Sequence, residues 1–222
     1  MGRTALLRRL LLVPPTLVGV AVVVFVLLRV VPGDPIAMMI PPGASADDID
    51  RLRAAYGLDK SILVQLVAWF GDLVTGHLGT SISLRQSVGT LILGRLPATL
   101  ELVAIATLIA VALGTALALA GAFYRRGPGE WIVDGIIGVV VAIPDFLWGL
   151  IFILLLGVVY PVLPISGRID PRLSTDFATQ FYLVEALVTG QLTIARGLLA
   201  HMLMPAVALA LPLAAIIARV LK

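Results

Sequence analysis

Long uncharged runs, separated by short charged segments, dominate the pattern of hydrophobic and polar positions along this chain. The most informative run covers residues 96–123, where LPATLELVAIATLIAVALGTALALAGAF carries no charge after Glu101. A helix of this length rises further than the hydrocarbon core of a bilayer, which is about 30 Å thick. The pattern therefore predicts a transmembrane helix over residues 96–123.

The positive charges behind this run orient it in the membrane. Arg125 and Arg126 follow it directly, and basic residues close to a span stay on the cytoplasmic side. We therefore expect residues 124–130 to form a cytoplasmic turn, and the Pro97 end of the helix to lie outside.

The N-terminal segment predicts a further transmembrane helix. An uncharged run over residues 10–28 follows Arg3, Arg8 and Arg9. The run is longer than the apolar part of a signal peptide, so we interpret it as a retained helix. Residues 1–30 are thus expected to hold a cytoplasmic N-terminus and the first span.

Two more spans are predicted in the C-terminal half, over residues 131–160 and 201–221. An outside loop over residues 161–200 is expected to join them. Arg219 and Lys222 mark the cytoplasmic end of the last span. With four spans, both termini are expected in the cytoplasm.

Residues 31–95 change character, because charged residues return among short amphipathic segments. We expect an extracytoplasmic loop domain. Ser45 followed by Asp48 resembles a capping box that opens a short helix. Apolar residues recur at helical spacing over residues 62–74, so this helix either packs against protein or lies on the membrane. A further short helix is expected to be interrupted at Pro97, before the second span.

Small residues spaced four apart mark helix surfaces that another helix can approach closely. One such strip lies on the second span and another on the last span. The candidate helix-packing positions are Ala110, Gly114, Ala118, Ala210 and Ala214.

Three residues are candidates for a pathway or gate. Glu101 lies in the first turns of its predicted span, where the helix dipole favours a negative charge. Pro144 and Asp145 lie near the middle of the third predicted span. Proline frees a backbone carbonyl, and a carboxylate at membrane depth requires a partner. Asp145 is therefore either a pathway carboxylate or a structural acid bound to amides at a helix break.

Composition supports the membrane interpretation. The chain is 60% hydrophobic and 13% charged, with a mean hydropathy of +1.08, which is typical of an integral membrane protein. Membrane topology explains the net charge of +3, so we expect no nucleic-acid partner. With no cysteine and only two histidines, no catalytic, metal or cofactor site is expected. The sequence has no G-x-x-x-x-G-K-[ST] motif, so any nucleotide would bind another chain.

A series of short motifs carries a family resemblance. In order these are RRLLLVPPTLVGV, VVPGDP, AAYGLDKSILVQ, GTS, LPATLEL, YRRG, AIPDFLWG and VLPISGR. The series resembles the first integral-membrane subunit of dipeptide/oligopeptide ABC importers. The resemblance implies an all-α membrane protein with the type I ABC importer permease fold, whose core here begins at residue 96 and continues to residue 222.

The resemblance also implies a function and a set of partners. A subunit of this family is not an enzyme but forms the pathway for di- or oligopeptides in a bacterial or archaeal cytoplasmic membrane. It works with a second homologous permease subunit and an extracytoplasmic substrate-binding protein. Two separate ATPase subunits bind ATP and Mg, and no cofactor is expected on this chain. Membrane lipid is expected to surround its spans.

Two features leave alternatives open. The family subunit has six spans, whereas four are predicted here, so we expect a truncated form or a fragment that lacks the cytoplasmic coupling helix. The motifs do not state the cargo, and a nickel or haem importer of the same family is an alternative. A non-transporting membrane scaffold is an alternative from another functional class.

Overall fold

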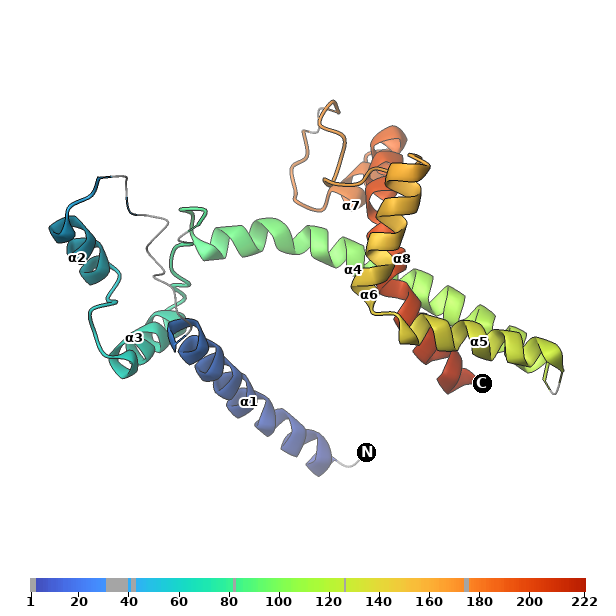
Figure 1. Cartoon of the computed structure of the whole chain (residues 1–222), viewed down its shortest axis with the longest axis horizontal. Coiled ribbons are helices and arrows are strands. Elements are labelled where there is room, and N and C mark those ends of the chain that lie inside the picture. The colour runs from blue at the N-terminus through green and yellow to red at the C-terminus, as the bar shows by residue number, and fades with distance from the viewer. Residues whose placement is uncertain (1–2, 31–39, 41–42, 82, 126, 174–175) are drawn as a thin grey trace. The chain divides into compact units, whose positions relative to one another are not determined.

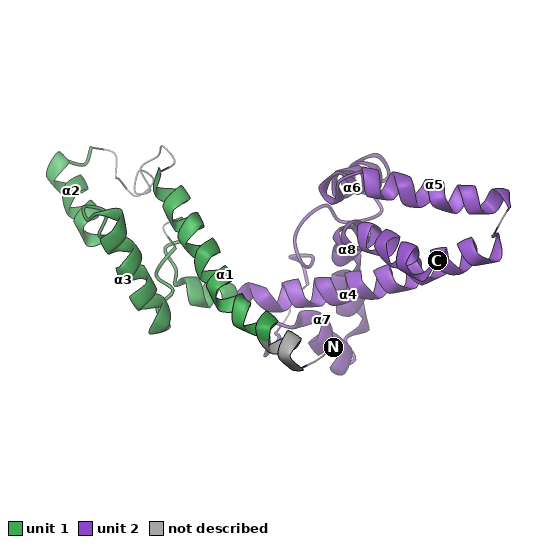
Figure 2. Ribbon diagram, turned by 90° about the horizontal axis from the view of Figure 1, so that it is seen from below, with its two compact units in different colours: residues 1–92 green, residues 93–222 purple. Residues whose placement is uncertain are grey.

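The computed structural model of this chain describes residues 3–30, 40, 43–81, 83–125, 127–173 and 176–222 (Figure 1). The described residues form α-helices and one π-helix, with no strand among them. Arg126 and most of the segment over residues 31–42 lie outside the described residues. The chain divides into two compact units, residues 1–92 and residues 93–222 (Figure 2).

The described helices identify the chain as an all-α, multi-pass membrane protein. Helix α1 (Arg3–Val30), helix α4 (Val88–Phe123) and helix α8 (Leu192–Leu221) are each long and apolar enough to cross a membrane. Helix α5 (Pro128–Ala142) is followed by helix α6 (Asp145–Phe152) and the π-helix η2 (Ile153–Val159). These elements make a fourth span if α5 and the α6–η2 segment are counted together as one bent span.

The first unit contains α1 and two shorter helices, α2 (Ala46–Ala55) and α3 (Ile62–Val74). The capping box predicted at the start of α2 is confirmed, because Ser45 Oγ accepts the Asp48 amide N–H and the Asp48 carboxylate accepts the Ser45 amide N–H. Two orphan amides of the first turn are thereby satisfied. Local sequence chemistry alone is sufficient to place this helix start.

Helix α3 packs on the C-terminal part of α1 through aromatic and polar side chains. Phe25, which is buried, lies 5.5 Å from Trp69 between ring centroids. The Arg29 guanidinium lies 3.5 Å above the Phe25 ring, and Arg29 Nε donates to Gln65 Oε1 over 2.8 Å. These contacts hold an arginine at the end of an apolar helix without leaving its charge unsatisfied.

In the second unit, α4 differs from the sequence expectation. The predicted interruption at Pro97 is wrong, because α4 runs continuously from Val88 to Phe123. Proline removes one backbone hydrogen bond from a helix interior and crowds the preceding turn. Pro97 is itself buried, so its ring is packed against protein, which offsets that loss.

The third predicted span is broken. Helices α5 and the α6–η2 segment meet at an angle of 96° across a short break. After η2 the chain turns back on itself, since the amides of Val162 and Leu163 both donate to the Leu156 carbonyl. Ile165 then lies against Gly157, at a place where a Cβ would not fit.

The last helix is longer than predicted. Helix α8 begins at Leu192 rather than at His201, and a short helix α7 (Tyr182–Val188) precedes it within the expected outside loop. Ala195 and Leu198 are buried against α7, while Arg196 is exposed. Packing of one apolar face therefore extends the helix beyond the span predicted from the sequence, past the charged Arg196.

Helix α8 is the centre of the second unit. Helices α5, α6 and α7 all contact it, and Figure 1 shows the three arranged along its length. Its N-terminal part packs with α7, and its C-terminal part packs with α5. Small residues fill the contact between α8 and α4, as described next.

Candidate functional site

The small-residue positions on α4 and α8 lie at a shared buried contact. Ala110, Ala210 and Ala214 form one buried cluster. At Gly114 an added Cβ would lie 2.8 Å from the Ala214 carbonyl oxygen and 2.8 Å from the Ile217 side chain. Ala118 is buried on the same side of α4. The two backbones therefore approach as closely as small side chains allow.

Glu101 is placed differently from the sequence expectation. Because α4 begins at Val88, Glu101 lies well inside the helix rather than in its first turn. The dipole of α4 therefore does not account for a negative charge at this position. The side chain is only 5% exposed. A carboxylate buried to this degree requires charged or hydrogen-bonding partners.

The partners of Glu101 come from two other segments of the second unit. Glu101 Oε2 accepts a hydrogen bond from Arg168 Nη2 over 2.8 Å. Glu101 Oε1 accepts the amide N–H of Leu183 over 2.9 Å and that of Val184 over 3.2 Å. These amides belong to the first turn of α7, so the carboxylate caps α7 and meets the positive end of that helix's dipole.

Arg168 joins the other segments of the cluster. Its Nη2 also donates to the Gln180 carbonyl over 2.6 Å, and its guanidinium lies 3.9 Å above the Tyr182 ring. The buried Nε has no partner among the described residues. Arg168 thus ties the loop after η2 to α4 and to the segment that leads into α7.

Sequence reasoning did not assign this role to Arg168. In the sequence, Arg168 is the last residue of the VLPISGR motif. The available signal was Glu101 itself, since an acid in an apolar helix calls for a basic partner on another segment. Nothing in the sequence pattern chooses among the candidate arginines.

The turn before α7 is built around Glu185. Its carboxylate accepts hydrogen bonds from the Thr179 hydroxyl over 2.6 Å, from the Ala178 amide over 2.7 Å and from the Thr179 amide over 2.8 Å. These hydrogen bonds, that of the Thr179 hydroxyl first, lower the pKa of Glu185 below its usual value. The ionised form therefore stabilises the turn.

Pro144 and Asp145 lie at the break between α5 and α6. Pro144 precedes α6 in an extended conformation, and Asp145 is the first residue of α6. Asp145 is exposed and accepts the Phe146 amide N–H at Oδ1 over 2.8 Å. The proline leaves the Val140 carbonyl without a helical donor, and the Trp148 indole N–H lies 3.5 Å from that oxygen.

Glu101 and the break are therefore separate features. The contacts of Glu101 are with Arg168 and α7, whereas Asp145 contacts the first turn of its own helix. A carboxylate at the first position of a helix is favoured by the helix dipole. Asp145 thus has a backbone partner and still presents its charge at the surface of the second unit.

A cavity of about 180 Å³ lies beside the bent segment. Residues of α6, η2, the returning loop and α8 line it: Gly149, Ile153, Pro164, Ile165, Ser166, Gly167, His201, Met204 and Pro205. The Nδ1 atom of His201 lies 2.8 Å from the Gly197 carbonyl oxygen. The cavity walls are mostly apolar, with Ser166 and His201 as the polar side chains.

At the far end of α8, Lys222 pairs with two acids of α5. Lys222 Nζ lies 2.6 Å from Asp134 Oδ1 and 3.3 Å from Glu130 Oε1. The hydrogen bond with Asp134 is the main cause of the raised pKa of Lys222. The ion pairs join the first turns of α5 to the end of α8.

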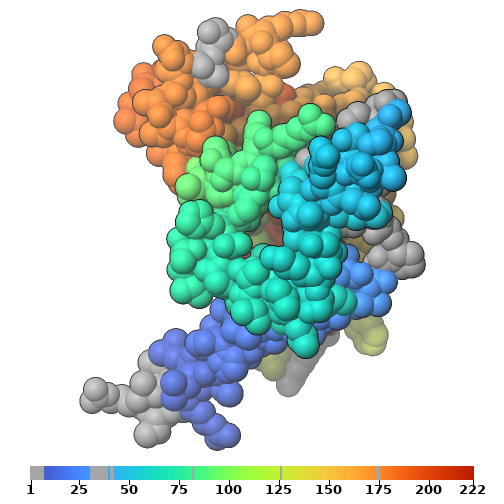
Figure 3. All heavy atoms as spheres, turned by 90° about the vertical axis from the view of Figure 1, so that its left-hand side faces the viewer, coloured from blue at the N-terminus to red at the C-terminus, as the bar shows by residue number. Residues whose placement is uncertain are grey.

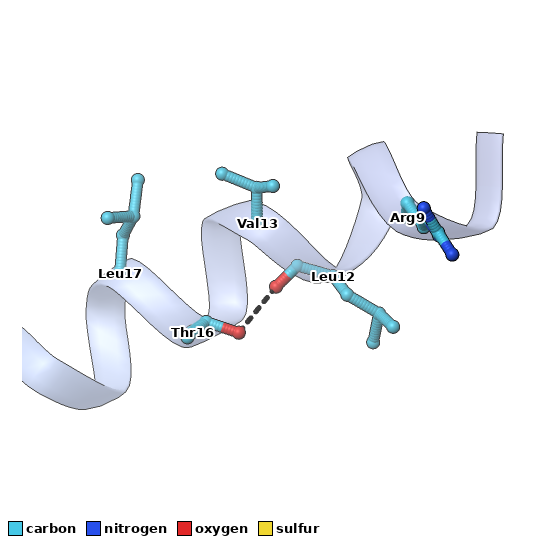
Figure 4. A pocket seen from close by; sticks show the side chains of 5 residues that line it. All are labelled: Arg9, Leu12, Val13, Thr16 and Leu17. Atoms are coloured by element: carbon cyan, nitrogen blue, oxygen red, sulfur yellow. Dashed lines mark hydrogen bonds between the residues drawn. The ribbon is translucent and has the colours of Figure 1, made fainter. Parts of the chain in front are cut away.

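A second hollow, of about 210 Å³, lies on α1 (Figure 4). Arg9, Leu12, Val13, Thr16 and Leu17 line it, all from one helix. The Thr16 hydroxyl donates to the Leu12 carbonyl over 2.7 Å, so it is already satisfied. We interpret this surface as an unpaired helix face rather than a ligand site.

Comparison with known proteins shows similarity to membrane components of transport systems. Residues 3–103 match the N-terminal region of the membrane components of binding-protein-dependent transport systems. The chain is 35% identical to the di/tripeptide transport system permease protein DppB of Pseudomonas aeruginosa, over 97% of this chain and 64% of that protein. It is 32% identical to the dipeptide transport system permease protein DppB of Escherichia coli K12, over 96% of this chain and 64% of that protein.

A relative from another bacterium shows the same kind of similarity. The oligopeptide transport system permease protein AppB of Bacillus subtilis is 35% identical over 78% of this chain and 54% of its own length. The chain thus spans less than two thirds of the length of these relatives. Over residues 3–103 it is similar to the membrane components of binding-protein-dependent transport systems, and over nearly its whole length it is similar to peptide permeases.

Proposed function

We propose that this chain is a permease subunit of an ABC importer and forms part of the translocation pathway for di- or oligopeptides. The observation that carries the proposal is similarity over nearly the whole chain to proteins named as permeases of di/tripeptide and dipeptide transport systems. The multi-pass helical architecture, with one span broken near its middle, supports it.

The proposed assembly contains further chains. It comprises a second homologous permease subunit, two ATPase subunits that bind ATP and Mg, and an extracytoplasmic binding protein that delivers the peptide. The arginines in the N-terminal part of α1 and after α4 favour a cytoplasmic N-terminus in a bacterial or archaeal cytoplasmic membrane. In this orientation residues 31–95 form a loop domain outside the cell, where the binding protein docks.

Among the candidate residues, we propose Pro144 and Asp145 for the gate. A helix break with an exposed acid can change its angle when the ATPases move. Glu101 is the weaker gate candidate, because both of its oxygens already bind partners. Its contacts favour a role in positioning α7 and the returning loop.

Transport in reconstituted vesicles tests the proposal. This chain is co-expressed with its partner subunits, and uptake of a radiolabelled dipeptide and tripeptide is measured with and without ATP in the presence of the binding protein. We expect ATP-dependent uptake of the labelled peptide. Unlabelled peptide should reduce this uptake by competition, whereas Ni²⁺ and haem should not. Equal uptake from vesicles lacking this chain would contradict the proposal, as would competition by the metal or haem alone.

A further inference from the structure

The turn between α4 and α5 borders a hollow of about 580 Å³. This volume lies in the range of roughly 300–1,000 Å³ that is typical of sites for small organic ligands. Phe123, Tyr124, Ile132 and Val133 form its apolar wall, and Arg125 is the charged residue that lines it. The two helices diverge from this turn (Figure 2), so the hollow lies where one span ends and the next begins.

The backbone of the turn shapes this hollow. The Gly127 amide donates to the Tyr124 carbonyl over 3.0 Å, and the Glu130 amide donates to the Gly127 carbonyl over 3.1 Å. An added Cβ at Gly129 would lie 2.7 Å from Tyr124 Cγ, so the absence of a side chain lets the Tyr124 ring lie against the start of α5. The hollow is therefore formed by a closed turn rather than by side chains alone.

The acidic residues at the start of α5 face away from the hollow. At 3.6 residues per turn the lining positions of α5 fall on one face of the helix, and Glu130 and Asp134 fall on the opposite face. Both acids contact Lys222 Nζ, over 3.3 Å and 2.6 Å. Arg125 is exposed, and it forms no ion pair with any residue that the structure describes. Its positive charge is therefore uncompensated beside an apolar wall.

Three helices place the hollow at the edge of the hydrocarbon region. Lys222 joins the end of α8 to the first turns of α5, and an added Cβ at Gly121 of α4 would lie 3.2 Å from Lys222 Cε. Charged residues are favoured at the ends of membrane spans, where water and headgroups solvate them. The exposed rings of Tyr124 and Trp131 are typical of a membrane–water interface. The hollow thus lies at the boundary between acyl chains and headgroups.

A second arginine beside apolar residues provides a comparison. Arg9 borders the smaller hollow on α1, whose lining residues all belong to that helix. The N-terminal part of α1, in dark blue, projects from the first unit (Figure 3). A single helix offers no second wall along which an acyl chain can lie. Arg9 therefore shares the charge of Arg125 but not its enclosed surroundings.

We propose that the hollow at the turn between α4 and α5 binds an anionic phospholipid, with Arg125 at the headgroup phosphate and an acyl chain along Phe123 and Ile132. A guanidinium pairs with phosphate oxygens in a bidentate geometry, and basic pockets at the ends of membrane helices bind anionic headgroups. Charge complementarity selects this occupant, because an uncompensated cation and an apolar wall meet at the depth where a phospholipid carries its phosphate. The site requires that α4 and α5 lie in a membrane, and it does not depend on peptide transport.

Native mass spectrometry of the intact, delipidated protein in detergent measures the binding of each lipid. Phosphatidylglycerol and phosphatidylcholine with identical acyl chains are compared, so that only the headgroup differs. We expect phosphatidylglycerol to bind more tightly. Arg125→Gln should weaken its binding about fivefold, which is the effect of losing one basic contact with an anionic lipid surface. Binding of phosphatidylcholine should stay unchanged.

Two controls separate a built site from general attraction of anions. Arg9→Gln removes an arginine beside the hollow on α1 and should leave the preference for phosphatidylglycerol unchanged. Inorganic phosphate should not displace the lipid, because the apolar wall contributes to binding. Equal affinity for the two lipids, equal losses in the two arginine variants, or displacement by inorganic phosphate would each overturn the proposal.

A tryptophan on the wall tests occupancy in the membrane. Phe123 is 83% exposed, so Phe123→Trp should fold normally in a variant whose three native tryptophans are replaced by phenylalanine. In vesicles, phosphatidylglycerol brominated on its acyl chains should quench this fluorescence more than brominated phosphatidylcholine at the same mole fraction. Arg125→Gln should remove the difference. An absence of quenching by both lipids would show that another protein covers the hollow, and this result would also overturn the proposal.

Discussion

The carboxylate of Glu101 in α4 and the guanidinium of Arg168 in the loop after η2 form an ion pair of 2.8 Å. The pair joins segments separated by 67 residues in the sequence. The second carboxylate oxygen of Glu101 binds the first turn of α7. One buried acid therefore fixes both the returning loop and the short helix that precedes α8.

Removing the charge of Glu101 should destabilise the second unit. In Glu101→Gln the amide oxygen still accepts the α7 amides, but Arg168 loses its counter-charge in a partly buried position. Breaking a buried pair costs about 3–5 kcal/mol, and the 23% exposure of Arg168 favours the lower end, about 3 kcal/mol. Thermal unfolding of the purified protein in detergent should show a lower Tm.

A double-variant cycle separates the pair from the other contacts. Arg168→Met alone leaves Glu101 uncompensated, so it should also be destabilising. The combined variant Glu101→Gln/Arg168→Met should lose less stability than the sum of the two single changes, because the double variant leaves no unpaired charge whereas each single change leaves one. Simple additivity would show that the two side chains are not coupled.

The contact between α4 and α8 should depend on the absence of a side chain at Gly114. In Gly114→Ala the new methyl meets the Ala214 carbonyl and Ile217, and overpacking of this kind costs about 1–3 kcal/mol. Gly94→Ala is the matched control in the same helix, since its added Cβ meets nothing within 4 Å. It should be neutral or stabilising by up to about 1 kcal/mol.

Thermal unfolding of both glycine variants provides the measurement. A lower Tm for Gly114→Ala, together with an unchanged or higher Tm for Gly94→Ala, is the expected pattern. If the two substitutions shifted the Tm equally, the difference in space at the two positions would not control stability.

The features that follow from local chemistry were predictable from the sequence, and those that depend on tertiary contacts were not. The long apolar runs indicated the spans, Ser45 and Asp48 indicated the start of α2, and Pro144 indicated an irregular third span. The start of α8 depends on packing against α7, and the continuity of α4 through Pro97 depends on burial. Glu101 stood out as an acid in an apolar helix, but only the fold brings Arg168 to it.

The turn held by Glu185 should lose its order in acid. The pKa of Glu185 is lowered in the folded protein from its usual value of 4.5. Its contribution to stability is therefore fully present above that value and is lost as the pH falls through the lower, folded pKa. Hydrogen exchange at the amides of Ala178 and Thr179 should show protection near neutral pH that is lost on acidification.

Glu185→Gln is the control for this pH dependence, because its side chain does not ionise. Comparing the two proteins at each pH removes the intrinsic effect of pH on amide exchange. The expected result is a difference in protection at neutral pH that disappears in acid. Equal protection of both proteins at neutral pH would show that the charge of Glu185 does not order the turn.

The proposed gate predicts that Asp145→Asn lowers peptide uptake while the complex assembles normally. Asparagine retains an oxygen that can accept the Phe146 amide, so the start of α6 is preserved and only the charge is lost. A drop in the ATP-dependent uptake rate of about tenfold requires a change of only about 1.4 kcal/mol in the barrier. The fall in rate is measured by peptide uptake into reconstituted vesicles.

Asp170→Asn is the matched control for the gate. Asp170 also accepts a nearby backbone amide, that of Arg172 over 2.9 Å, but it lies in the returning loop rather than at the break. It should leave uptake unchanged. Normal uptake by Asp145→Asn would remove this carboxylate from the mechanism, whereas equal losses in both variants would reflect a general sensitivity to charge. Only a selective loss at Asp145 supports a gate at the break between α5 and α6.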